Sequence, residues 1–215
     1  MAQTPKTNYQ LILDKTLQQL TAEGKRPRLL LHSCCAPCSS YVLEYLTQYF
    51  DITVFFYNPN ISPESEYRYR EEELRRLISE MCPQVSFIEG RYEPERFFEM
   101  AKGLENEPER GKRCHKCYRM RMTEAADAAK AGGFDYFTTT LSISPQKDSA
   151  VLHTIGKEIS DQYGVPYLFS DFKKRGGYKR SIELSAQFSL YRQNFCGCPF
   201  SQRRACAPDS RRSLH

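Results

Sequence analysis

Apolar and polar positions recur with two different periods along the chain, and these periods predict strands and helices in turn. Three consecutive leucines at residues 29–31 are typical of a strand buried on both faces of a parallel sheet. Beyond them, Ser39 or Ser40 can cap a helix whose apolar residues continue at helical spacing to Phe50. The core therefore begins with a strand, a loop and a helix.

The same alternation recurs along most of the chain. Further strands are expected at residues 52–57, 85–88, 134–140 and 165–169. Helices are expected to begin at Pro63, at Glu93, just after Cys117 and at Pro145, with residues 105–113 as an exposed loop. Because Pro166 cannot donate a ladder hydrogen bond, the last strand is expected near an edge. This order predicts an α/β fold with a doubly wound parallel sheet of about five strands.

The 215 residues are expected to form one domain with two extensions. Residues 1–28 form an N-terminal helical extension, 29–201 the α/β domain with a loop-rich, cysteine-bearing end, and 202–215 a basic tail. Residues 11–20 have an amphipathic helical pattern that differs from a signal peptide, and no apolar run approaches membrane-spanning length. We therefore expect a cytoplasmic protein with no membrane partner.

Cysteine content and charge narrow the function. Nine cysteines are too many for ordinary core use in a reducing compartment, so metal binding or thiol redox chemistry is the better interpretation. The net charge is +5, and basic residues gather late in the chain, at 173–175, 179–180, 203–204 and 211–212. This favours a polyanionic partner, but a solvated basic face explains the same pattern.

Four cysteines form two close pairs at predicted loop-to-helix junctions: Cys34 with Cys35, and Cys114 with Cys117. Four thiolates are the ligand set of a four-iron four-sulfur cluster, and a structural zinc site uses the same number. Spacing alone leaves both interpretations open. Cys38 is left over from this set, so it can bind a second metal, replace Cys34 or Cys35, or have no role.

A third cysteine pair, Cys196-Gly197-Cys198, has a spacing that suits redox chemistry. A C-x-C disulfide closes a small strained ring, for which Gly197 supplies backbone freedom, and strained disulfides are the labile ones. The alternative is a pair of metal ligands. Cys82, which precedes a proline, is expected to be a small core residue.

Residues 176–178, Gly-Gly-Tyr, are flanked by lysines and arginines. They are expected to form a flexible basic loop in which Tyr178 is exposed, a mixture that suits phosphate contacts and base stacking. An ordinary solvated loop is the alternative. No glycine-rich phosphate loop follows the first strand, which argues against nucleotide hydrolysis there.

Several unusual motifs follow one another in a single order. They are Leu30-Leu31-His32-x-Cys34-Cys35-Ala36-Pro37-Cys38-Ser39, Tyr57-Asn58-Pro59-Asn60-Ile61, Arg110-Gly111-x-Arg113-Cys114-x-x-Cys117, Ser144-Pro145-x-Lys147, Asp171-Phe172-Lys173-Lys174 and Leu190-Tyr191-Arg192-Gln193-x-x-Cys196-Gly197-Cys198. In this order the chain resembles the cobalamin-independent epoxyqueuosine reductases, the QueH family, over about residues 29–201. Ala186 departs from the family, which usually has a lysine there.

The resemblance implies a Rossmann-like fold of the adenine nucleotide alpha-hydrolase type, with thiols in place of the phosphate loop. It implies reduction of the epoxide of epoxyqueuosine to queuosine at the wobble position of tRNA, the last step of queuosine biosynthesis. It also implies a [4Fe-4S] cluster on Cys34, Cys35, Cys114 and Cys117, an additional iron near Cys38, and a redox-active pair of Cys196 and Cys198.

Converting an epoxide to an alkene takes two electrons and two protons. We hypothesise that an iron centre polarises the oxygen, and that the Cys196/Cys198 dithiol supplies electrons and is re-reduced by an external electron donor. Asp148, Asp171 and Tyr178 are the candidates for proton delivery. Two other functions fit the residues: a tRNA-sulfurating enzyme of the same fold class, which would bind ATP, and a zinc-stabilised nucleic-acid-binding module with redox-inert thiols.

Overall fold

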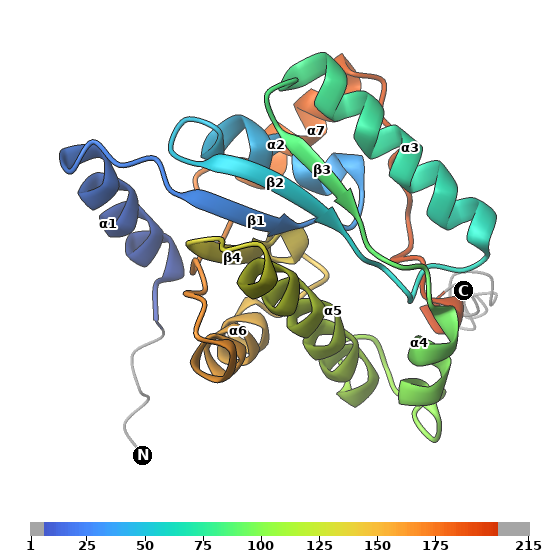
Figure 1. The fold of residues 1–215 in the computed structure, drawn as a ribbon. Helices are drawn as coiled ribbons and strands as arrows, with labels where there is room; N and C mark the ends of the chain where they lie inside the picture. The colour runs from blue at the N-terminus through green and yellow to red at the C-terminus, as the bar shows by residue number, and fades with distance from the viewer. Residues whose placement is uncertain (1–6, 202–215) are drawn as a thin grey trace, which may run out of the picture.

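A parallel sheet with helices on both faces forms the core of the structure, a computed structural model that describes residues 7–201 (Figure 1). The strands lie in the order β3-β2-β1-β4, and each neighbouring pair is parallel. The chain runs outward from β1 to β3 and then returns to the other side of β1, so the sheet is doubly wound. The predicted α/β class is confirmed. The strands are β1 (Arg28–His32), β2 (Asp51–Phe56), β3 (Ser86–Glu89) and β4 (Tyr136–Thr139).

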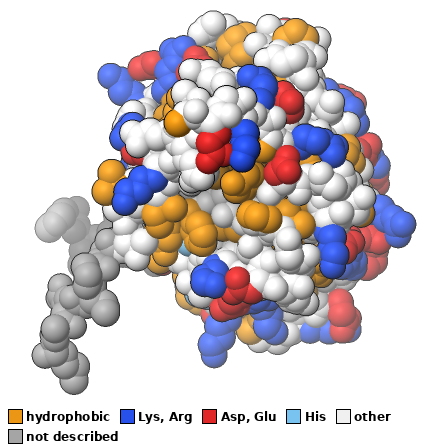
Figure 2. All heavy atoms as spheres, turned by 60° about the vertical axis from the view of Figure 1, so that its left-hand side comes forward, with side chains coloured by type: hydrophobic (Ala, Val, Ile, Leu, Met, Phe, Trp, Pro, Cys, Tyr) orange, Lys and Arg blue, Asp and Glu red, His pale blue; other side chains and the backbone are white. Residues whose placement is uncertain are grey.

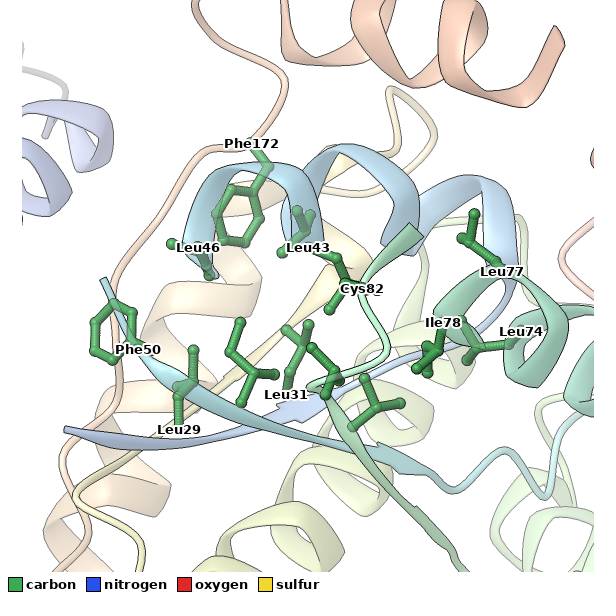
Figure 3. Packing of buried hydrophobic residues seen from close by; sticks show 14 of the residues in the cluster. Leu29, Leu31, Leu43, Leu46, Phe50, Leu74, Leu77, Ile78, Cys82 and Phe172 are labelled. Atoms are coloured by element: carbon green, nitrogen blue, oxygen red, sulfur yellow. The ribbon is translucent and has the colours of Figure 1, made fainter. Parts of the chain in front are cut away.

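Alternate residues of each strand face opposite helical layers. Leu29 and Leu31 belong to the cluster that packs under α2 and α3, as Figure 3 shows, whereas Leu30 packs with α5 and α6 on the other face. This period of two explains why residues 29–31 are all apolar. The helices are α1 (Tyr9–Ala22), α2 (Ala36–Leu46), α3 (Glu64–Met81), α4 (Pro94–Ala101), α5 (Lys112–Ala131), α6 (Ser149–Tyr163) and α7 (Gly177–Gln187), with a 3-10 turn η1 (Thr140–Ile143).

The expected fifth strand is wrong as a full strand. Residues 165–169 contact the sheet through one parallel bridge between Phe137 and Tyr167. The Phe137 amide donates to the carbonyl of Pro166, and the Leu168 amide donates back to Phe137. Because Pro166 itself has no amide hydrogen, the ladder does not extend beyond this bridge.

Three predicted helix boundaries are also wrong. The helix after β1 begins at Ala36, ahead of Ser39, because Pro37 fits the first turn. The helix that carries Cys114 and Cys117 begins at Lys112, so both cysteines lie in its first two turns. The helix expected at Pro145 begins only at Ser149, where Asp148 caps it by accepting hydrogen bonds from the amides of residues 150 and 151.

The basic segment around Tyr178 is more ordered than a flexible loop, because α7 begins at Gly177. Much of its charge is paired: Lys173 contacts Asp171, Arg175 contacts Asp14, and Arg180 contacts Glu44. Figure 2 likewise shows lysine and arginine side chains intermingled with acidic ones on the face that it presents. The basic pairs at 203–204 and 211–212, and the predicted tail 202–215, lie outside the described residues. Within residues 7–201, no helix has the length and apolar character needed to cross a membrane.

His153 gives the fold an acid-sensitive element. The residue is 1% exposed, and its ring packs against Tyr9, Tyr167 and Phe169. Burial lowers its pKa to about 4, while Asp171 raises this pKa and Lys173 lowers it. The unfolded chain therefore takes up a proton below its ordinary pKa of about 6.5, while the folded chain stays neutral until about pH 4. This group makes folding less favourable as the pH falls through that window.

We expect the His153→Phe variant to lose this dependence, because phenylalanine keeps the aromatic packing without a titrating nitrogen. Between pH 7.5 and 5 the wild type should lose about 2 kcal/mol more unfolding free energy than the variant does. Urea unfolding at the two pH values measures this difference. An equal loss in both proteins would contradict the assignment to His153.

Candidate functional site

The site lies at the carboxyl ends of β1 and β4, next to the point where the strand order reverses. Open α/β sheets bind their ligands at this position. The chain leaves β1 at His32 and enters α2 with Cys35 at its N-cap. Cys34 lies in the short turn between them, and its Sγ is 3.7 Å from Thr140 Oγ1, just beyond β4.

Three thiols meet in this turn. The sulfur atoms of Cys34, Cys35 and Cys38 all lie within 4.8 Å of one another. Cys38 joins the adjacent pair because it lies one turn into α2 from its N-cap, which brings its side chain back over Cys35. It is therefore part of the group in space, although by spacing it was left over.

Hydrogen bonds give the three thiols different roles: Cys34 accepts, Cys35 donates and accepts, and Cys38 donates. Thiol hydrogen bonds from Cys35 and Cys38 hold the pKa of Cys34 well below its ordinary value. Donation to Cys34 raises the pKa of Cys35 to about 12, although the hydrogen bond from Cys38 lowers it, and donation to both neighbours holds the pKa of Cys38 well above its usual range. Cys34 is thus the first of the group to become a thiolate, the form that binds metals.

His32 forms hydrogen bonds that link the carboxyl ends of β1, β2 and β4. Its Nε2 lies 3.1 Å from the carbonyl oxygen of Tyr57, which can only accept, so Nε2 carries the hydrogen. Nδ1 then accepts from Thr139 Oγ1 at 2.8 Å. Burial, with the charge of Arg121, lowers the pKa of His32 to about 3, so the ring is neutral and serves as a clamp.

The second cysteine pair is positioned by a buried arginine. Arg113 is 1% exposed and donates to three carbonyl oxygens of the preceding loop, those of residues 104, 105 and 107. This fixes the start of α5, where Cys114 and Cys117 lie. Burial raises the pKa of Cys117. Among the described residues, neither joins the group within 4.8 Å of Cys34.

The Cys196–Cys198 segment is held against the loop that follows β2. Asn60 donates to the carbonyl of Cys196 at 3.4 Å, and the Ser62 amide donates to the carbonyl of Gly197 at 3.0 Å. Gly197 has φ +90°, and a Cβ there would lie 2.8 Å from Ile61, so only glycine fits without strain. Cys198 packs in a buried cluster with Cys117, and Cys196 lies against that cluster.

Within this pair, Cys196 is the thiol that ionises first. A hydrogen bond from Cys198 and the positive charge of Lys147 hold its pKa well below the ordinary value. The same hydrogen bond raises the pKa of Cys198. Burial opposes the charge on Lys147, but Cys196, Tyr118 and Cys114, when ionised, together raise its pKa. The sequence placed Lys147 in the Ser144-Pro145-x-Lys147 motif but did not indicate that its charge acts on this cysteine pair.

Arg121 supplies positive charge between the two cysteine corners. It is 3% exposed, donates to the neutral amide of Asn58, and its Nε has no partner among residues 7–201. Its charge acts on both Cys34 and Cys117. A buried guanidinium needs a negative counterpart, which ionised thiols can provide. The donor set therefore fits a thiolate-bound metal centre.

A cavity of about 380 Å³ opens above these groups. Three cysteines line it, Cys34 and Cys38 from the turn after β1 and Cys196 from the late segment, so both thiol groups reach one space. Its other lining residues include the cations Arg70, Arg121, Lys147 and Arg192, the carboxylate Glu109, and Tyr178, Ser181, Gln193, Asn194 and Phe195.

Of the three proton-donor candidates, only Tyr178 is among the described residues that line the cavity. Tyr178 lines it, whereas Asp148 caps α6 and Asp171 pairs with Lys173, and neither is among the described residues that line the cavity. Glu109 does line it and accepts a hydrogen bond from Ser201, three residues beyond Cys198. Sequence reasoning missed Glu109, because it is one of several acidic residues in an exposed polar loop.

Comparison with known proteins identifies the family of this chain. The family model described as "Epoxyqueuosine reductase QueH" matches residues 29–204. The chain belongs to the QueH family. The predicted resemblance is thereby confirmed, and QueH proteins are named as oxidoreductases of epoxyqueuosine.

Relatives cover nearly the whole chain. A protein named "Epoxyqueuosine reductase QueH" from Staphylococcus epidermidis is 45% identical over 202 residues, 91% of this chain and 85% of the relative. The QueH protein of Staphylococcus aureus is 43% identical over 91% of this chain and 84% of its own length. That of Thermotoga maritima is 36% identical over 87% of this chain and 98% of its own length.

Proposed function

We propose that this protein reduces the epoxide of epoxyqueuosine to queuosine in tRNA. The observation that carries the proposal is the cavity of about 380 Å³, because thiols from Cys34, Cys38 and Cys196 reach it together. Membership of the QueH family supplies the substrate class. A nucleoside-sized cavity lined by thiols suits reduction of a modified nucleoside.

The proposed ligands of a [4Fe-4S] cluster are Cys34, Cys35, Cys114 and Cys117, with Cys38 as a ligand of an additional iron. Iron bound there would supply Lewis-acid polarisation of the epoxide oxygen. The gathering of Cys34, Cys35 and Cys38 and the buried charge of Arg121 support thiolate ligation at this corner. A four-iron cube spreads its four ligands more widely than a single ion does, so a second corner at Cys114 and Cys117 is compatible with it.

The electron count of the reaction matches the Cys196/Cys198 pair. Oxidising two thiols to a disulfide releases two electrons and two protons. Removing the epoxide oxygen as water and leaving an alkene consumes two electrons and two protons. Because Lys147 and Cys198 hold Cys196 as the thiolate, the pair releases its two electrons with one proton, and the second proton comes from solvent. An external electron donor restores the dithiol. Glu109 lines the cavity and can carry solvent protons to the oxygen.

The assay for this function is incubation of anaerobically purified protein with tRNA that contains epoxyqueuosine, in the presence of a chemical reductant. The digested nucleoside should become lighter by one oxygen atom. Recovery of unchanged nucleoside from protein that retains its metal would contradict the proposal. A nucleoside that gains sulfur in the presence of ATP would instead identify the sulfurating alternative.

A further inference from the structure

One wall of the cavity has the chemistry of a nucleobase site, and no step of the proposed reduction uses it. The wall is formed by the first turn of α7 and by the segment that follows this helix. It consists of Tyr178, Ser181, Arg192, Gln193 and Asn194. The thiols Cys34, Cys38 and Cys196 line another part of the same cavity.

Arg192 lies over one face of the Tyr178 ring on this wall. The guanidinium carbon of Arg192 lies 5.9 Å from the centroid of the Tyr178 ring. Arg192 is fixed there by hydrogen bonds to the Ser181 carbonyl and, at 3.0 Å, to Ser185 Oγ. Tyr178 remains 37% exposed, and among the tyrosines of the described residues only Tyr69 is more exposed. Aromatic rings and guanidinium planes are the groups on which unstacked RNA bases lie.

Polar groups beside this surface can read the edge of a base. Gln193 Oε1 is buried and has no hydrogen-bond partner among the described residues, and the neighbouring Asn194 presents a second amide at the cavity. Side-chain amides offer a donor and an acceptor side by side, the pattern that matches a base edge. An unpartnered buried oxygen is costly, so a ligand that donates to it gains affinity.

We propose that Tyr178, supported by Arg192, is the stacking platform for the planar base of the modified nucleotide, with the Gln193 amide at the base edge. The modification on the base then extends toward the thiols on the other part of the cavity. This inference rests on the proposed function and specifies how that site binds RNA. It gives Tyr178 a binding role through its ring, distinct from proton delivery through its hydroxyl group.

Three variants of the full protein test the platform. Tyr178→Leu removes the ring, Tyr178→Phe removes only the hydroxyl, and Tyr69→Leu is the control, since Tyr69 is 49% exposed on α3 and is absent from the cavity lining. KM and kcat are measured on an anticodon stem-loop RNA that carries epoxyqueuosine. RNA affinity is measured separately with the queuosine form, by fluorescence anisotropy.

The leucine variant should raise KM and weaken RNA binding by about 5- to 150-fold, the value of one stacked base, with kcat nearly unchanged. The phenylalanine variant should keep the wild-type RNA affinity, and the control should behave as the wild type does. Equal losses in kcat for Tyr178→Phe and Tyr178→Leu, or unchanged RNA affinity in Tyr178→Leu, would overturn the platform. A wild type that binds RNA without reducing it would overturn the proposed function alone, and the affinities would still decide the role of Tyr178.

Discussion

Replacing Cys198 with serine is expected to abolish turnover while leaving the visible absorbance of the bound iron centre intact. Serine cannot form a disulfide, so the two electrons of the dithiol are lost. Its hydroxyl can still donate to Cys196, which keeps the geometry of the 196–198 turn. We expect multiple-turnover activity to fall by at least about a thousandfold.

The measurement is the rate of queuosine formation, set beside the absorbance spectrum of the same anaerobic sample. The control is Cys82→Ala, because Cys82 is 4% exposed in the apolar core under α3 and is remote from the cavity lining (Figure 3). Full activity in Cys198→Ser would remove the dithiol from the mechanism. Loss of the absorbance would instead make Cys198 a metal ligand, the alternative that its spacing left open.

Removing the thiol of Cys35 is expected to empty the metal site. Cys35 is the N-cap residue of α2 and belongs to the sulfur group with Cys34 and Cys38, and its Sγ lies 3.8 Å from that of Cys34. In Cys35→Ala the iron content per chain should fall close to zero, and reductase activity should fall with it. Iron analysis of anaerobic preparations measures this loss.

Cys82→Ala again provides the comparison, since it removes a buried thiol of equal size. It should keep its iron and lose only about 1 kcal/mol of unfolding free energy. Equal iron content in Cys35→Ala and the wild type would show that the corner after β1 does not bind the metal. Equal iron loss in both variants would show that the effect comes from general destabilisation.

The sequence predicted most of the fold because its strands and helices have strong periods. The leucines at 29–31 and the long pattern of α3 could be assigned directly. The sequence also indicated the core position of Cys82, which the structure confirms. The failures fall where one proline or one cap decides a boundary: Pro166 limits the last strand to a bridge, and Asp148 starts α6 four residues later than expected.

The candidate site was predictable where residues are close in sequence and hidden where the fold brings them together. The C-C-x-x-C spacing located three thiols, but their mutual contact depends on where α2 begins. His32 appeared only as part of the first motif and Arg121 in no motif. Neither role could be predicted, because the partners Thr139 and Asn58 are distant in sequence. Glu109 was equally hidden, since only the cavity distinguishes it from neighbouring acidic residues.

The proposed reductase depends on these cysteines holding an iron–sulfur centre at the carboxyl edge of the sheet. Iron, acid-labile sulfide and zinc should be counted per chain in protein purified without oxygen. We expect a coloured protein with about four iron and four sulfide per chain, or one iron more where Cys38 binds its own ion. A colourless protein with one zinc per chain and no sulfide would contradict it.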